Sequence, residues 1–355
     1  VCMESTGKYW IPVFNILEPT CNIVLAHPKY VKAIRGKKTD KRDAKWIADI
    51  FKHDLVSSSF IPPYDIRQLR DLMRYRYKLT NFTVGEKNRA QNCLTVSNVK
   101  LDDVFSDVFG KSSSAILDRL SLCPNGDFDV APLVNGKCKS SVEKIQAAVD
   151  GSICPEQLQK LAIIRSHINA IYECKSNLDS LICSIADKFR AQVNLVSSVP
   201  GIQFFSAVSV ISEIGVDMSV FPTAKHLCSW AGLVPQNNES AGKKKTTRIS
   251  RAGAYLKPLL VQCALTVCKS SKHPEIRNRY LMLKKRRGHK KAIIAICRML
   301  LTAIYAILKT ATPYNPNLYR SQNSTPKSRT FTPISAIAFL KSHGYVVVDC
   351  DGVMT

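Results

Sequence analysis

Two acidic residues three positions apart, Asp40 and Asp43, open a segment whose apolar residues recur at helical spacing. Side chains at this spacing lie on one side of a helix, so both carboxylates can face the same ligand. Mg²⁺ prefers carboxylate oxygens and uses them at sites of phosphoryl transfer. Glu4 follows a stretch that can end a strand and can join such a site. The alternative is a structural role, in which these acids favour a helix N-terminus or cap an element.

The segment 235–251, which is expected to be a polar loop, carries a second candidate chemistry. It contains Ser240, whose small neighbours Ala241 and Gly242 let a bulky phosphate backbone approach closely. A serine hydroxyl needs activation to act as a nucleophile, and the segment has no histidine to serve as a base. The alternative is a solvated loop with an inert serine. The cations that follow the serine can neutralise phosphates: Lys243, Lys244, Lys245, Arg248 and Arg251.

The third candidate is a run with six cations among eight residues, placed between two helical patterns. Such runs are often a solvated face or a targeting tag. The whole chain has 51 Lys and Arg against 27 Asp and Glu, a formal net charge of +24, so we expect a polyanionic partner. Contact with a nucleic-acid backbone is therefore the favoured interpretation of the run. Its cations are Lys284, Lys285, Arg286, Arg287, Lys290 and Lys291.

Composition narrows the class of protein. A chain of 355 residues with 45% apolar content can form two or three domains, and it is neither disordered nor collagen-like. The 13 cysteines lack metal-ligand spacing and indicate reduced thiols. With no secretory signal visible, we expect a cytoplasmic protein. The apolar stretch 292–308 contains Arg298 and falls short of the ~20 residues that cross a bilayer, so we predict a buried helix and no membrane partner.

The elements that must position these residues follow from periodicity. A strand at 21–26 precedes a helix that starts at Thr39 or Asp40. Two long helices, 65–97 and 155–193, are expected to form an antiparallel hairpin or coiled coil. The predicted apolar stripe of the first long helix comprises Leu69, Leu72, Met73, Tyr77 and Leu79.

The C-terminal half is predicted to be helical. Residues 201–215 indicate a helix-turn-helix pair whose glycines allow close backbone approach. Helices are expected at 252–269 and 289–309, and irregular chain from 312 to about 330. The fold class is thus α/β at the start and mostly α afterwards.

Several motifs together resemble the transposases of the insertion-sequence-110 family. They occur in the family's order and approximate spacing, and they cover most of the chain up to about residue 319. The motifs are MESTGKYW at 3–10, KTDKRDA at 38–44, GLVP at 232–235, SAG at 240–242 and RISRAG at 248–253.

The resemblance implies a RuvC-like, RNase H-type domain with an Asp-Glu-Asp-Asp metal site that binds Mg²⁺. Matched by motif, Glu4, Asp40 and Asp43 are the second, third and fourth carboxylates. Ser240 is then the nucleophile that forms a covalent link to DNA. The expected domains are a partial RuvC-like domain at 1–60, a helical hairpin or coiled-coil connector at 61–195, a transposase domain with the serine at 196–315, and a disordered or aberrant tail at 316–355.

The family also implies partners. These are DNA, a guide RNA called the bridge RNA, and further copies of the chain, as a dimer or tetramer in a bacterial or archaeal cytoplasm. In the family's arrangement the carboxylates of one subunit stand beside the serine of another.

The chain also departs from the family pattern. The family's first Asp lies on a strand upstream of the glutamate, and this sequence starts three residues before Glu4, so we expect that Asp and the opening strands to be missing. Ala241 stands where the family usually has Gly. The tail from about residue 320 does not resemble the family.

Three functions remain open from the sequence. The first is a DNA transposase or recombinase that cleaves and exchanges strands of an insertion sequence with Mg²⁺ and a bridge RNA. The second is a catalytically dead remnant that binds DNA or RNA. The third is a junction nuclease of the RuvC type, which cuts through water and would tolerate loss of Ser240.

Overall fold

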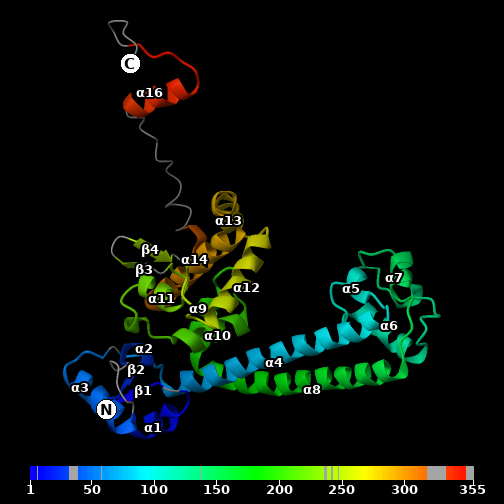
Figure 1. The fold of residues 1–355 in the computed structure, drawn as a ribbon, viewed down its shortest axis with the longest axis horizontal. Coiled ribbons are helices and arrows are strands. Elements are labelled where there is room, and N and C mark those ends of the chain that lie inside the picture. Colours follow the sequence, from blue (N-terminus) through cyan, green and yellow to red (C-terminus); the bar gives the residue numbers. More distant parts are fainter. Residues whose placement is uncertain are drawn as a thin grey trace.

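The computed structural model describes residues 1–5, 7–31, 39–56, 58–136, 138–235, 238–240, 243–246, 248–317 and 333–348, with the backbone alone at 29–30, 238–240, 243–246 and 333–335. Helices dominate these residues, and the strands among them form two small sheets (Figure 1). The prediction of a mostly helical chain with a small α/β unit at its start is confirmed.

The chain begins with a β-α-β unit. Its two strands pair in parallel, with Glu4 opposite Ala26, and a helix connects them because parallel neighbours need a crossover. A later helix packs against the first strand and helps to bury Val31 and Ile50. The elements are β1 (Cys2–Glu4), α1 (Trp10–Leu17), β2 (Val24–Ala26), α2 (Pro28–Val31) and α3 (Asp40–Lys52).

Two long helices, α4 (Tyr64–Val96) and α8 (Pro155–Ala186), form the predicted antiparallel hairpin and lie side by side (Figure 1). α8 ends before the predicted residue 193, because the 3₁₀ turn Asp187–Phe189 separates it from α9 (Arg190–Ser197). Tyr77 was expected on the buried stripe of α4, but its side chain is 43% exposed.

Short helices close the far end of the hairpin around a core of their own. Leu94 of α4 and Leu161 of α8 belong to this core, so the hairpin and its tip fold as one packed unit. The tip elements are α5 (Leu101–Val104), α6 (Lys111–Leu122), the 3₁₀ turn η1 (Ala131–Leu133) and α7 (Val142–Ala148).

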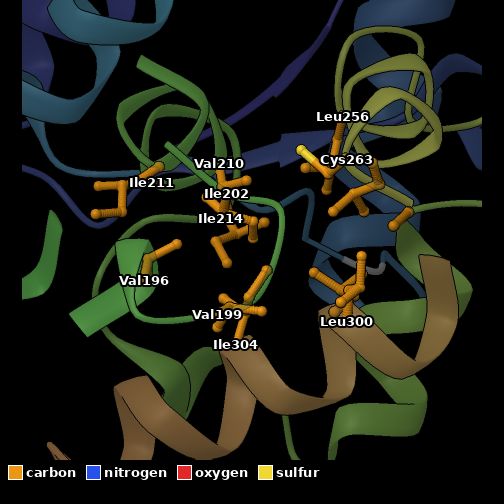
Figure 2. Packing of buried hydrophobic residues seen from close by; sticks show 14 of the residues in the cluster. Val196, Val199, Ile202, Val210, Ile211, Ile214, Leu256, Cys263, Leu300 and Ile304 are labelled. Atoms are coloured by element: carbon orange, nitrogen blue, oxygen red, sulfur yellow. The ribbon is translucent and has the colours of Figure 1, made fainter. Parts of the chain in front are cut away.

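The C-terminal unit holds the largest core. Figure 2 shows Val196, Ile211, Cys263 and Leu300 among the apolar side chains that converge there from four helices. Its elements are α9, α10 (Phe204–Ile214), the 3₁₀ turn η3 (Met218–Val220), α11 (Ala224–Trp230), β3 (Asn238–Ser240), β4 (Lys243–Thr246), α12 (Leu256–Lys269), α13 (Pro274–Arg287) and α14 (His289–Thr310).

α14 is, within the described residues, the one helix whose length and composition would suffice to cross a membrane. Nine of its side chains are buried, and eight of them belong to the C-terminal core, beside α11, α12 and α13. The helix therefore has the character predicted for 292–308, that of a buried core helix.

The turn between α9 and α10 depends on a glycine. Gly201 has a φ of +81°, and a Cβ at this position would lie 2.7 Å from the carbonyl oxygen of Cys263 in α12. Both the backbone conformation and the space exclude a side chain. The close approach that the sequence predicted at this glycine is confirmed.

An ion-pair cluster joins the hairpin to the C-terminal unit. Arg74 of α4 donates two hydrogen bonds, of 2.7 and 2.8 Å, to the carboxylate of Glu213 in α10, and the Glu213 side chain is only 7% exposed. Arg70 donates to the backbone carbonyls of Ser212 and Glu213 at 2.9 and 2.7 Å. Burial lowers the pKa of Arg70 to about 10, against the opposing effect of the Glu213 charge. Arg70 remains charged at neutral pH and binds the C-terminal end of α10.

The segment 316–355, expected to be a disordered or aberrant tail, is not irregular throughout. It contains the helix α16 (Pro333–Ser342), which periodicity did not predict. Most of the segment expected to be irregular, up to about residue 330, lies outside the described residues.

We expect Glu213→Ala to lower the free energy of unfolding by about 2–4 kcal/mol, because it leaves two arginines without their carboxylate partner. The loss is smaller than for a fully buried pair because the Arg74 side chain is 39% exposed and water screens part of its charge. Urea unfolding followed by circular dichroism measures the change.

The control is Asp118→Ala, which removes the partner of Arg165 at the hairpin tip, where the Asp118 side chain is 63% exposed. An exposed pair contributes less than about 1 kcal/mol. Equal losses in the two variants would show that the Glu213 cluster does not hold the units together.

Candidate functional site

Glu4 is the last residue of β1, whereas the sequence predicted that it directly follows a strand. The parallel register with β2 fixes its backbone, and the next amide, that of Ser5, donates to the carbonyl of Ala26 at 2.9 Å. The Glu4 side chain is half-buried. The strand that ends with this residue packs against α3.

α3 places the other two carboxylates. Thr39 is its N-cap, with the side-chain oxygen accepting from the Arg42 amide at 3.4 Å, so the helix begins at Asp40 as the sequence predicted. Asp40 and Asp43 both fall in the first turn, Asp40 exposed and Asp43 half-buried. The Trp46 indole donates to the Val31 carbonyl at 3.0 Å and ties α3 to the end of α2.

These residues partly fit a divalent metal. Their donors are carboxylate oxygens, the type that Mg²⁺ prefers, and the elements that carry them pack together. Within the part of the chain that the structure describes, however, no three His, Cys, Asp or Glu side chains are grouped closely enough to hold an ion. Glu4, Asp40 and Asp43 therefore do not form a complete metal centre by themselves.

Ser240 ends a strand. The segment 235–251 was expected to be a loop, but β3 and β4 pair in antiparallel register with Ser240 opposite Lys243. A bridge between Pro235 and Ile249 continues the pairing. Glycine is a sequence signal for a hairpin turn, and Gly242 had been interpreted only as a small neighbour of the serine.

The side chains on this hairpin lie outside the described residues, both that of Ser240 and those of Lys243, Lys244 and Lys245. Arg248 and Arg251 follow the hairpin and are exposed. Figure 1 draws the β-hairpin of β3 and β4 well apart from α3 and β1. One copy of the chain thus has Ser240 and the carboxylates on separate parts of the molecule.

The basic run lies at a sharp connection between two helices. Four of its cations form the last turn of α13, and after Gly288, with a φ of +81°, two more lie in the first turn of α14. All six are exposed, and none forms an ion pair with a described residue. We call Lys284, Lys285, Arg286, Arg287, Lys290 and Lys291 the basic elbow.

Helix dipoles act in opposite directions at the two ends of the elbow. Cations stabilise the C-terminus of α13, but Lys290 and Lys291 sit at the N-terminus of α14, where no acid balances them. Tyr280 and His289 brace the connection, with the hydroxyl and Nδ1 2.8 Å apart. A phosphate at the start of α14 would relieve the unfavourable charge.

α13 was not predicted from the sequence, because its only buried side chain is Ile276 and its apolar periodicity is therefore weak. Its ends do carry signals. Pro274 occupies the first turn, and Gly288 follows the last residue. These two residues would have bounded the helix.

Comparisons with known proteins agree with this architecture. A model of the transposase IS116/IS110/IS902 family matches residues 193–281, and a model of IS110-type DEDD transposases matches residues 1–98. The first covers the hairpin with Ser240, and the second covers all three candidate carboxylates. The chain belongs to the IS110 family of transposases.

The regions that match curated relatives cover only part of each relative's length. The transposase for insertion sequence element IS1111A of Coxiella burnetii is 27% identical over 157 residues, which are 41% of this chain and 43% of the relative. The pilin gene-inverting protein of Moraxella lacunata is 31% identical over 160 residues, 44% of this chain and 48% of the relative. The matches thus span less than half of these curated relatives.

We expect Lys290→Ala with Lys291→Ala to weaken binding to duplex DNA and to reduce the slope of log Kobs against log salt concentration by about 1.8, since each lost phosphate contact contributes ~0.9. The double variant should fold at least as stably as the parent, because it removes two cations from a helix N-terminus. Fluorescence anisotropy at several salt concentrations measures the slope.

The matched control is Lys144→Ala with Lys160→Ala, which removes the same charge from exposed positions at the hairpin tip. Its slope should stay near that of the parent. A similar reduction in both double variants would mean that total charge, and not the elbow, governs binding.

Proposed function

We propose that this protein is a DNA transposase that cleaves and exchanges the strands of an insertion sequence, with Ser240 as its nucleophile. The observation that carries the proposal is that the two family models match this chain around Glu4, Asp40 and Asp43 on one side and around Ser240 on the other. The name of the Moraxella relative, a gene-inverting protein, supports strand exchange as the reaction class.

In the proposed step, the Ser240 oxygen attacks the scissile phosphorus of DNA. A bond forms between the serine oxygen and phosphorus, and the bond from phosphorus to one deoxyribose oxygen breaks. The hydroxyl proton passes to water, and the departing oxygen takes up a proton. Because one phosphate ester replaces another, the step conserves the energy of the broken bond. A deoxyribose hydroxyl of a new strand can then attack the serine–phosphate ester and displace the serine without an external energy source.

Glu4, Asp40 and Asp43 are proposed to hold Mg²⁺ together with the DNA phosphate. Mg²⁺ is commonly bound by one or two carboxylates plus substrate phosphates and water, so a complete protein cage is not required before DNA arrives. When bound, the ion would neutralise charge on the scissile phosphate and ease deprotonation of the serine hydroxyl, whose segment 235–251 contains no histidine.

We further propose that the site forms between copies of the chain, in a dimer or tetramer. The separation of Ser240 from α3 within one copy supports this arrangement. The basic elbow would hold the DNA backbone together with the cations on and just after the β-hairpin of β3 and β4. These are Lys243, Lys244, Lys245, Arg248 and Arg251. Guidance by a bridge RNA and a cytoplasmic location are proposed from the family alone.

The test uses the full-length protein, Mg²⁺ and a labelled duplex that carries the insertion element's own ends. We expect a covalent protein–DNA adduct that survives denaturing electrophoresis. Ser240→Ala should abolish it, and Asp40→Asn, Asp43→Asn or chelation by EDTA should reduce it at least about 100-fold, the loss typical of a removed electrostatic contribution.

Two matched controls accompany these variants. Ser229→Ala changes an exposed serine of α11, and Asp49→Asn changes an exposed acid on α3 itself, and both should form the adduct normally. DNA retention without any adduct would favour a binding remnant. Cleavage that persists in Ser240→Ala would favour a nuclease that acts through water.

A further inference from the structure

A groove separate from the proposed catalytic residues lies where the helical hairpin meets the C-terminal unit. It is formed by α4, α10 and α12 and has a volume of about 500 Å³. Pockets of this size hold small molecules or single nucleotides. The residues that determine its chemistry are Tyr77, Tyr255, Phe205, Arg76, Asn81 and Gln262.

Flat side chains form the walls of the groove. The rings of Tyr77 and Tyr255 meet edge to face with centroids 5.6 Å apart. The guanidinium of Arg74 lies 4.6 Å from the Tyr255 centroid, and that of Arg76 lies 4.1 Å from the Phe205 centroid. Aromatic rings and guanidinium planes are the surfaces on which nucleobases stack.

The two arginines are held in place before any ligand binds. Arg74 forms its bidentate pair with Glu213, and Arg76 donates to both carboxylate oxygens of Asp179 at 2.6 and 3.0 Å. Bidentate pairing fixes the plane of a guanidinium. The walls are therefore preorganised, which reduces the entropy lost on binding.

Polar groups that can read a flat ligand lie at the rim. Asn81 and Gln262 are exposed, and neither side chain hydrogen-bonds to a described residue. Side-chain amides offer both a donor and an acceptor to the edge of a base. Tyr77, which was expected on the buried stripe of α4, lines the groove and is 43% exposed.

Positive charge accumulates at one margin of the groove. Lys175 donates to Thr80, a lining residue, at 3.2 Å, and it interacts electrostatically with Arg76 and with Asp179, the carboxylate that pairs with Arg76. Burial and the neighbouring Arg76 lower the pKa of Lys175. Two cations facing one carboxylate leave a net positive potential that attracts a phosphate.

We propose that this groove binds one unpaired nucleotide of a nucleic-acid strand, with the base against the aromatic walls and the phosphate at the cationic margin. The proposal rests on the proposed function only in that it requires a nucleic-acid ligand. A paired duplex does not present a free base face, so the groove selects single-stranded segments, in RNA or in DNA. It places a strand contact at the joint between the two large units.

The test measures binding of the full-length protein to fluorescein-labelled oligouridine, oligothymidine and a duplex of equal length. Tyr77→Ala and Tyr255→Ala should weaken binding of the single strand by about 5- to 150-fold, the effect of removing one stacking platform, and leave duplex binding unchanged. Tyr77→Phe keeps the ring and should bind like the parent. The strand whose affinity falls, RNA or DNA, identifies the natural source.

The matched control is Tyr75→Ala, on the same helix, 50% exposed and outside the groove. Circular dichroism and thermal unfolding establish that each variant is folded. Unchanged single-strand affinity in Tyr77→Ala, or an equal loss in Tyr75→Ala, overturns the proposal. Ser240→Ala should retain single-strand binding, so failure of the catalytic proposal and failure of the groove are told apart.

Discussion

The arrangement of the whole molecule depends on arginines in the first turns of α4. Arg70 and Arg74 bind Glu213 and the end of α10, while Arg67, on the preceding turn, donates two hydrogen bonds to Glu18 at 3.0 and 2.6 Å and holds the β-α-β unit. The Arg67 hydrogen bond lowers the pKa of Glu18, so this pair stays charged at neutral pH. One stretch of helix therefore positions the unit with the carboxylates relative to the unit with the serine.

Signals from residues close together in the sequence predicted the parts of the fold that depend on short-range interactions. The helix 65–97 and the start of α3 at Thr39 were placed within about a residue, because apolar spacing and a cap act over short distances. The strand end at Glu4 and the close approach at Gly201 followed from the same kind of signal. For the candidate site, the sequence predicted the elements that carry Glu4, Asp40 and Asp43, and their chemistry remains a proposal.

Features that depend on distant residues escaped prediction. The contact between Arg74 and Glu213 joins positions 139 residues apart, and no periodicity reports such a pair. The hairpin around Ser240 was taken for a loop because its strands are polar and three to four residues long. Counting cations also could not separate Arg70, Arg74 and Arg76, which bind carboxylates or carbonyls of the protein itself, from the six exposed cations of the basic elbow.

The burial of α14 explains how the fold remains stable with the cations of the basic elbow at the start of this helix. Lys290 and Lys291 oppose the dipole of α14, at a cost of about 0.3–1 kcal/mol each. The same helix buries nine side chains, eight of them in the C-terminal core, and each large apolar side chain so buried contributes about 1.5–3 kcal/mol. A helix anchored this firmly keeps its cations fixed at an exposed end even though they weaken it. Charge that is unfavourable for the fold, held on a helix that is anchored in the core, is therefore best explained by a ligand that neutralises it.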